Sequence, residues 1–202
     1  AEFQQLDGQE QSFVHSTMMQ YVSWVTKMQK LSTTGVDALT EPKWNISTET
    51  PYQGGWCRPQ TDGPGLRARA LMRFASSLSS PLKHQVWKLV TFDLDWLSNS
   101  KESSHETTCD LWEETTATDF LWNKVTQRAA LDEGSTFAMA MGDQTRASKY
   151  QQAAENFIGD PFATHVSKQA AFLTECPAVG GSDACIKYDK LVDGAVILSL
   201  VH

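Results

Sequence analysis

Apolar side chains recur every three or four residues along most of the chain, which is the spacing of one face of an α-helix. The pattern is clear at residues 11–31, where one face carries Val14, Met18, Tyr21, Val22, Val25 and Met28. Similar patterns predict helices at residues 65–79, 82–97 and 118–141, and weaker ones predict helices at 144–157, 161–174 and 190–200. No segment alternates convincingly as a half-buried strand does. We therefore predict an all-α fold of successive antiparallel helices.

Two long polar segments interrupt this pattern, at residues 32–63 and 99–116. The first is rich in Gly, Pro and Thr, yet it carries Trp44, Tyr52, Trp56 and Arg58. Long loops that bear aromatic side chains in a compact helical domain are usually functional rather than connective. Each segment joins one helix pair to the next, so we expect the two to gather on one face.

Length, charge and composition exclude several classes of function. The 202 residues are enough for one domain with a substantial core, or for part of a larger one. A formal charge of −7 argues against nucleic acid and against an anionic membrane surface as partners, because both reward basic patches. No apolar run approaches the roughly 20 residues that span a bilayer. The five histidines lack the spacing of metal ligands, so we expect neither a metal nor a cofactor.

Two weak signals concern the compartment. The cysteines Cys57, Cys109, Cys176 and Cys185 have no zinc-like spacing, and the last two are close enough in sequence to close a small loop. Residues 45–47 read Asn-Ile-Ser, which makes Asn45 a candidate for N-glycosylation, although such tripeptides occur often by chance. Together they favour a secreted or lumenal protein over a cytosolic one.

The strongest chemical signal is an acidic cluster, Asp-Leu-Trp-Glu-Glu, at residues 110–114. Asp110, Glu113 and Glu114 crowd around Trp112. Because like charges repel and an apolar ring lowers the local dielectric, at least one carboxyl should have a raised pKa and hold a proton near neutrality. A protonated carboxyl beside an ionised one suits the cleavage of acetals and glycosides. The alternative is a solvated acidic turn between two helices.

The acidic cluster is expected on a loop or at a helix entry. Neighbouring residues of a regular helix point about 100° apart, so Glu113 and Glu114 could not face one ligand from a helix. The lead-in from residue 99 is rich in Asn, Ser and Thr, which also favours a loop. In a loop, Trp112 can line one side of a binding site while two or three carboxylates point into it.

A second candidate site is Tyr-Gln-Gly-Gly-Trp-Cys-Arg-Pro-Gln at residues 52–60. Its two glycines let the backbone approach a ligand closely, and Tyr52, Trp56 and Arg58 offer stacking, hydroxyl and guanidinium contacts. Tryptophan rings usually fill cores, but flat rings also cover the apolar faces of sugars. The alternative is a packed structural loop in which Arg58 pairs with Asp62.

Three blocks together resemble the glucoamylases, the glycoside hydrolases of family 15. They are Glu-Pro-Lys-Trp-Asn at residues 41–45, the segment from Tyr52 to Pro64, and the acidic cluster at residues 110–114. Leu-Asp-Glu-Gly-Ser at residues 131–135 is similar to a further element of the family. The order and spacing of the blocks also agree, and the resemblance extends weakly from about residue 11 to residue 202.

The resemblance implies an inverting, exo-acting hydrolase. Such an enzyme releases β-glucose from the non-reducing ends of α-1,4-linked glucans, and more slowly from α-1,6 linkages. The implied fold is an (α/α)6 toroid with the pocket at one end, lined by the loops that join the helix pairs. The implied partner is therefore an α-glucan or a malto-oligosaccharide.

By motif position, the resemblance assigns Glu113 as the general acid. Asp110 matches a second acidic position that is sometimes assigned as the base, and we interpret it as a neighbour that tunes Glu113. Trp56 would contact substrate near the scissile bond, and Glu114 would bind sugar hydroxyls. The remaining implied substrate-binding residues are Tyr52, Arg58, Trp112 and Leu111, the last through its backbone carbonyl.

Two cysteines depart from the pattern of the family. Cys57 stands where a glycine is usual after the loop tryptophan, and Cys109 immediately precedes the acidic cluster. Since these cysteines flank two pocket motifs, they suggest a Cys57–Cys109 disulfide across the rim of the site.

The resemblance covers only the central part of the catalytic domain of the family. We expect residues 1–202 to be the middle of a single domain, with a Thr-Arg-Asp segment that grips the terminal glucose before it and the catalytic base after it. Such a chain would be active only with the remaining chains of the same enzyme. The alternatives are a non-catalytic carbohydrate-binding relative of the same fold and an enzyme of the trehalase or glucodextranase type.

Overall fold

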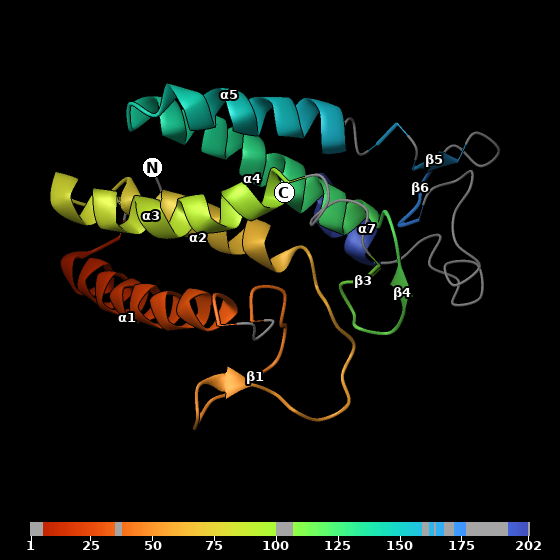
Figure 1. Cartoon of the computed structure of the whole chain (residues 1–202), viewed down its shortest axis with the longest axis horizontal. Coiled ribbons are helices and arrows are strands. Elements are labelled where there is room, and N and C mark those ends of the chain that lie inside the picture. The colour runs from red at the N-terminus through yellow and green to blue at the C-terminus, as the bar shows by residue number, and fades with distance from the viewer. Residues whose placement is uncertain are drawn as a thin grey trace.

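Helices make up most of the part of the chain that the structure describes. The computed structural model describes residues 6–34, 38–99, 107–158, 162–163, 165–167, 172–176 and 194–201. The helices are α1 (Gly8–Ser32), α2 (Gly63–Ala75), α3 (Ser80–Leu97), α4 (Leu121–Ala140), α5 (Gln144–Ala153), the π-helical turn η2 (Ala154–Ile158) and α7 (Gly194–Val201). Figure 1 shows α2 and α3 in the middle, α1 on one side of them, and α4 and α5 on the other. The predicted all-α class is confirmed.

Local sequence explains where the first two helices begin. The Asp7 carboxylate accepts hydrogen bonds from the N–H groups of Gln9 and Glu10, both at 2.8 Å, and the Glu10 carboxylate accepts one from the Asp7 N–H at 3.0 Å. This reciprocal capping satisfies donors that the first turn of α1 leaves unpaired. In α2, Pro64 lies in the first turn, where its missing N–H has no cost.

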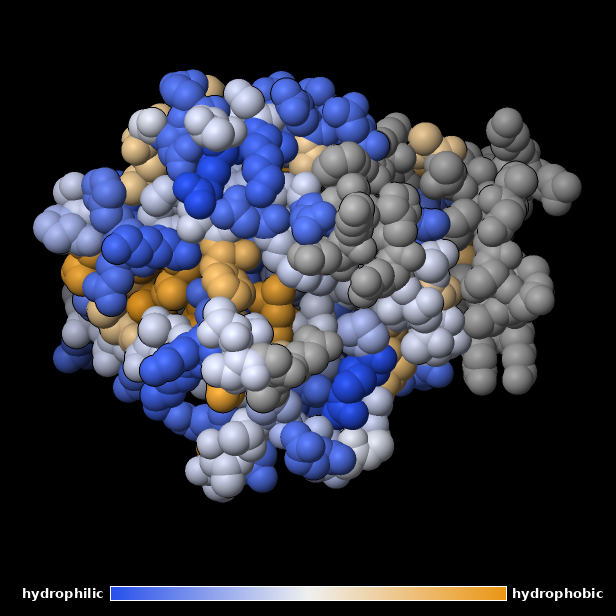
Figure 2. Space-filling view, viewed as in Figure 1, coloured by the Kyte–Doolittle hydropathy of each residue, from blue (hydrophilic) through white to orange (hydrophobic). Residues whose placement is uncertain are grey.

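The main core lies where α2 packs against α3 and α4, and the buried residues there include Leu71, Val90, Leu94, Leu97, Ala130 and Leu131. Gly134 in the middle of α4 has a packing reason. A Cβ at this position would overlap the Cδ1 atom of Leu94, so the glycine lets α3 and α4 approach closely. Figure 2 shows hydrophobic side chains reaching the surface where α1 and α3 adjoin, on a face that is otherwise mostly hydrophilic. Within the described residues, no helix has both the length and the apolar character needed to cross a membrane.

Three short antiparallel hairpins accompany the helices. The strands β1 (Trp44–Asn45) and β2 (Thr50–Pro51) pair within the first long loop, and β3 (Thr108–Cys109) and β4 (Thr116–Ala117) pair within the second. The strands β5 (Val166–Ser167) and β6 (Phe172–Leu173) form the third. Each strand has only two residues, too few to produce an alternating pattern in the sequence.

The third hairpin corrects one expectation. The weak pattern at residues 161–174 predicts a helix, but the described residues of this segment form turns and the strands β5 and β6. The Thr174 N–H donates to the His165 carbonyl at 2.8 Å, so the backbone hydrogen bond there runs across a hairpin and not along a helix. The last predicted helix is confirmed from residue 194 onward as α7, while residues 190–193 lie outside the described residues.

A buried ion pair joins α2 to α3. The Arg67 guanidinium donates to both carboxylate oxygens of Asp93, at 2.8 and 2.9 Å, and also to the Leu39 carbonyl at 3.2 Å. The Asp93 side chain has no exposed surface. Burial raises the pKa of this carboxyl, and the Arg67 charge opposes that rise.

We predict that R67M will lower the free energy of unfolding by about 3–5 kcal/mol, because it leaves a buried carboxylate without its cation. The control is K27M, which removes the exposed pair between Lys27 and Glu49 and should cost about 1 kcal/mol or less. Urea unfolding of the native protein at neutral pH measures both values. Equal, small losses in the two variants would contradict the prediction.

Candidate active site

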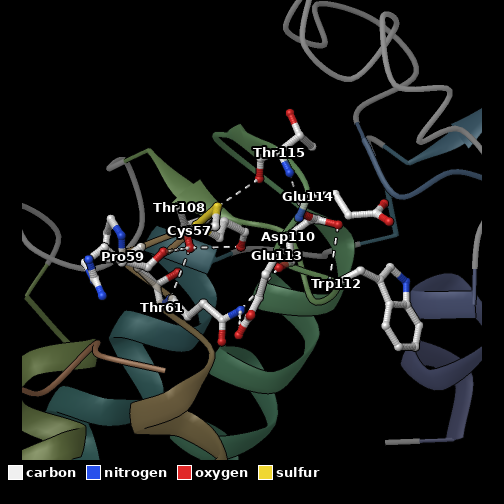
Figure 3. The surroundings of a disulfide bond; sticks show 12 residues. Cys57, Pro59, Thr61, Thr108, Asp110, Trp112, Glu113, Glu114 and Thr115 are labelled. Atoms are coloured by element: carbon white, nitrogen blue, oxygen red, sulfur yellow. Dashed lines mark hydrogen bonds between the residues drawn. A yellow bond between two sulfur atoms is a disulfide. The ribbon is translucent and has the colours of Figure 1, made fainter. Parts of the chain in front are cut away.

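The two long loops meet, as predicted, and a disulfide joins them (Figure 3). Cys57 and Cys109 are bonded, with their Cα atoms 5.9 Å apart, which confirms the predicted pair. Beside it, the Cys109 N–H donates to the Pro59 carbonyl at 2.8 Å, and the Thr61 N–H donates to the Thr108 hydroxyl at 3.1 Å.

The second cysteine pair is described only in part. Cys176 is also disulfide-bonded. Cys185, its partner in the sequence prediction, lies outside the described residues.

The start of α4 supports both loops from below. The Asn123 amide donates to the hydroxyls of Thr61 and Thr108, at 3.1 and 3.2 Å, and so contacts one residue of each loop. The Gln127 amide donates to the Thr61 carbonyl at 3.0 Å. These donors come from one rigid helix, so the two loops are held against a common surface.

Asp110 organises the acidic cluster from inside. Its carboxylate is 1% exposed, and one oxygen accepts hydrogen bonds from the N–H groups of Glu114 at 2.8 Å and Thr115 at 2.9 Å. The Asp110 carbonyl accepts from the Glu113 N–H at 3.0 Å. The carboxylate therefore faces the backbone of its own loop, which fits a supporting role better than that of a base acting on a water molecule.

Glu113 is the acid of the cluster that faces the first loop. One of its carboxylate oxygens accepts a hydrogen bond from the Gln60 amide at 3.2 Å, and the Trp56 side chain also hydrogen-bonds the carboxyl. Desolvation raises the pKa of Glu113, and the nearby charges of Asp110 and Asp62 add to the rise. The Trp56 hydrogen bond and the Lys43 charge oppose it. The predicted direction is confirmed, with burial as the largest cause.

The backbone explains why the three carboxylates diverge. Glu113 has φ of +62°, a left-handed conformation between neighbours of ordinary handedness. In Figure 3 its side chain points toward the Thr61 side of the site, whereas Glu114 and Trp112 point away from it. Glu114 and Trp112 are exposed, and Leu111 is half-buried. The expectation that two or three carboxylates point into one site is therefore wrong, because of the three only Glu113 faces the first loop.

An aromatic group with a cation lies next to Glu113. The Lys43 ammonium lies 3.2 Å from the centroid of the Trp56 ring and 4.6 Å from that of Tyr52, both within the range of cation–π attraction. Trp56 is nevertheless 41% exposed, so one part of its ring is open to a ligand. The sequence reasoning did not single out Lys43 or Gln60, although both lie in blocks that it identified.

Arg58 stabilises the first loop through contacts within it. It pairs with Glu41 at 2.8 Å and donates to the carbonyls of Tyr52 at 2.9 Å and Gly54 at 3.3 Å. The predicted alternative, a pair with Asp62, is wrong. Asp62 instead accepts a hydrogen bond from the Trp122 indole at 2.7 Å, and burial raises its pKa. A direct role for Arg58 in substrate binding stays a prediction.

Asn45 is the last residue of β1 and is exposed where the chain enters the turn to β2. Its side-chain oxygen accepts hydrogen bonds from the N–H groups of Ser47 at 3.0 Å and Thr48 at 3.2 Å. This turn presents the asparagine to solvent, as an acceptor of a glycan requires, and glycosylation of Asn45 stays a prediction.

Comparison with known proteins agrees with this geometry. The sequence pattern of the glycosyl hydrolases of family 15 matches residues 4–192. Glucoamylase-1 of Schizophyllum commune is 35% identical over 73% of this chain and 26% of its own length. Glucoamylase 1 of Rhizopus oryzae is 34% identical over 82% of this chain and 28% of its own length. The chain thus spans about a quarter of the length of these relatives.

The fold of the chain is also that of a solved structure. The glucoamylase of Hormoconis resinae superimposes with a TM-score of 0.65, at 24% identity, over 90% of this chain and 30% of that one. The helices described above are therefore part of an (α/α)6 toroid, as expected.

The charge of Lys43 provides a test of the site that does not depend on activity. We predict that K43M will raise the pKa of Glu113, because it removes a cation that favours the ionised carboxyl. Carboxyl 13C NMR of glutamate-labelled protein measures this pKa, and the resonance is assigned by its loss in E113Q. The control K149M removes a lysine that pairs with Asp95 and should leave the value unchanged. An unchanged or lower pKa in K43M would show that Lys43 does not act on Glu113.

Proposed function

The chain belongs to the glycosyl hydrolases of family 15, and from this membership we propose that the protein hydrolyses α-1,4-glucosidic bonds, and more slowly α-1,6 bonds, with inversion of configuration. It would release β-glucose from the non-reducing ends of α-glucans. The observation that carries the proposal is the Glu113 carboxyl, half-buried, with a raised pKa, and hydrogen-bonded by Trp56 and Gln60.

In this proposal Glu113 is the general acid. It donates its proton to the glycosidic oxygen while the bond from that oxygen to the anomeric carbon breaks. A water molecule attacks the opposite face of the anomeric carbon and gives its proton to a second carboxylate. Asp110 supports Glu113 through the loop backbone, so the base comes from another part of the protein. The activity accordingly belongs to the whole enzyme, with the remaining parts of the same enzyme as partners of this chain.

Substrate contacts follow from exposure around Glu113. Trp56 is 41% exposed beside Glu113, and its ring can cover the apolar face of a glucose unit there. Trp112, which is 48% exposed, and the exposed Glu114 lie on the outer side of the same loop, where the ring and the carboxylate can contact a neighbouring glucose unit. Tyr52 and the Leu111 carbonyl complete the proposed pocket, while Arg58 holds its first loop in place.

The compartment is part of the same proposal. Disulfides at Cys57, Cys109 and Cys176 are typical of an oxidising environment, and a secreted or lumenal enzyme would meet polymeric glucans there.

The first test replaces the proposed acid. Introduced into the whole enzyme, E113Q should lower kcat by about 10²–10⁴-fold, because the amide cannot donate the proton, while malto-oligosaccharide binding measured by calorimetry persists. The control is E155Q, which changes an exposed glutamate on η2 and should leave both properties unchanged. Near-normal turnover by E113Q would refute the acid assignment. A native protein that binds maltose without cleaving it would instead be a carbohydrate-binding relative.

The second test concerns the stereochemistry and the linkage. Early product from maltoheptaose, followed by proton NMR before mutarotation, should be β-glucose, because a single displacement at an α-linked carbon inverts it. Initial α-glucose would contradict an inverting mechanism. Cleavage of trehalose or dextran in preference to maltoheptaose would identify an enzyme of the trehalase or glucodextranase type.

A further inference from the structure

The Cys57–Cys109 disulfide occupies a particular place relative to the proposed acid. Cys57 directly follows Trp56, whose side chain hydrogen-bonds Glu113. Cys109 directly precedes Asp110, whose carboxylate accepts hydrogen bonds from the Trp112 N–H at 3.4 Å before Glu113 and from the N–H groups of Glu114 and Thr115 after it. The disulfide thus joins the neighbour of Trp56, which donates to Glu113, to the neighbour of Asp110, which holds the Glu113 backbone.

Up to Arg58, the segment that carries Trp56 hydrogen-bonds mainly within its own hairpin. Its ties to the second loop include the Cys57 disulfide and, from Pro59 onward, the Pro59 carbonyl and the Gln60 amide. Arg58 binds Glu41 and the carbonyls of Tyr52 and Gly54, and the Tyr52 N–H donates to the Lys43 carbonyl at 2.9 Å. These contacts all lie within residues 41–58. They make the hairpin a unit that carries the Trp56 ring and the Lys43 ammonium together.

The contact between this unit and Glu113 is open to solvent. Trp56 is 41% exposed and Glu113 is half-buried, so water competes for the hydrogen bond between them. Cys109, in contrast, is 1% exposed and is fixed in the β3–β4 hairpin by pairing with Thr116, and its N–H also donates to the Pro59 carbonyl, two residues beyond Cys57. A covalent bond from this fixed point to Cys57 limits how far the Trp56 segment can move from the acid.

We infer that the disulfide is a positioning element of the active site, which holds the Trp56 indole on the Glu113 carboxyl. The inference rests on the proposed function of Glu113. When the proton passes from Glu113 to the glycosidic oxygen, the carboxylate left behind gains the hydrogen bond of Trp56 at full strength. The disulfide also keeps the exposed Trp56 ring beside Glu113, where the substrate would bind.

The test removes both cysteines together, as C57A/C109A, so that no free thiol remains. We expect kcat to fall about fivefold, equal to about 1 kcal/mol, the typical contribution of one hydrogen bond. Loss of a donor to the carboxylate raises the pKa of Glu113, so the alkaline limb of the kcat profile moves to higher pH. The control C176A/C185A should lower the Tm and leave that limb in place. If the cavity that Cys109→Ala leaves in the core prevents folding, C57A/C109V fills that cavity and still removes the disulfide.

A second comparison shows whether the disulfide acts through Trp56. W56F keeps a ring but removes the donor, and it should shift the alkaline limb in the same direction. In the W56F background, removal of the disulfide should then cause no further shift. A further shift of equal size, or a lower Tm with unchanged kcat and pH profile in C57A/C109A, would overturn the inference.

The NMR titration of Glu113 separates this inference from the proposed function. If the native protein hydrolyses no glucan, the proposed function fails. The pKa of Glu113 in C57A/C109A still reports the positioning, because it should rise whether or not the protein is active. An unchanged pKa in that variant, beside full activity of the native protein, would overturn the inference alone.

Discussion

Burial of the Asp110 carboxylate is the constraint on which the site depends. A carboxylate removed from water must receive hydrogen bonds, and the available donors are the backbone N–H groups that follow it. Residues 111–115 wrap around this one side chain for that reason. The wrapping brings Glu113 to the Trp56 side of the loop and leaves Trp112 and Glu114 outside. The three carboxylates of the cluster therefore have different places: Asp110 is buried and holds the loop, Glu113 faces Trp56, and Glu114 is exposed.

The helices matter to the site chiefly through the beginnings of α2 and α4. Asp62 precedes α2 and accepts the indole N–H of Trp122 in α4, while the Glu175 side chain accepts the backbone N–H of Trp122 at 3.3 Å. Both carboxylates lie at helix N-termini, where the helix dipole favours negative charge. Asp62 also raises the pKa of Glu113. The helical scaffold therefore contributes electrostatics to the loops as well as support.

The helical part of the fold could be predicted because each helix repeats its signal over several turns. The side-chain contacts within and between the two loops could not be predicted, because they join residues that are far apart in the chain. Gln60 and Glu113 are 53 positions apart, and Arg58 and Glu41 are 17 apart. The alternative in which Arg58 pairs with Asp62 rested only on their proximity along the chain, whereas the true partner Glu41 lies 17 positions away. The disulfide was found because two cysteines flank two recognisable motifs. The pairing of β5 with β6 could not be predicted, because two-residue strands produce no periodic pattern in the sequence.

The left-handed backbone at Glu113 has a consequence for how this site can change. A non-glycine residue in that conformation costs about 1–2 kcal/mol, and glycine would remove the cost. Glycine also gives the unfolded chain more freedom, which offsets part of that gain, and it abolishes the carboxyl. Relief of the backbone strain and retention of the proposed acid are therefore opposed at this one position. The residue that defines the proposed activity is also a point of stored strain in the loop.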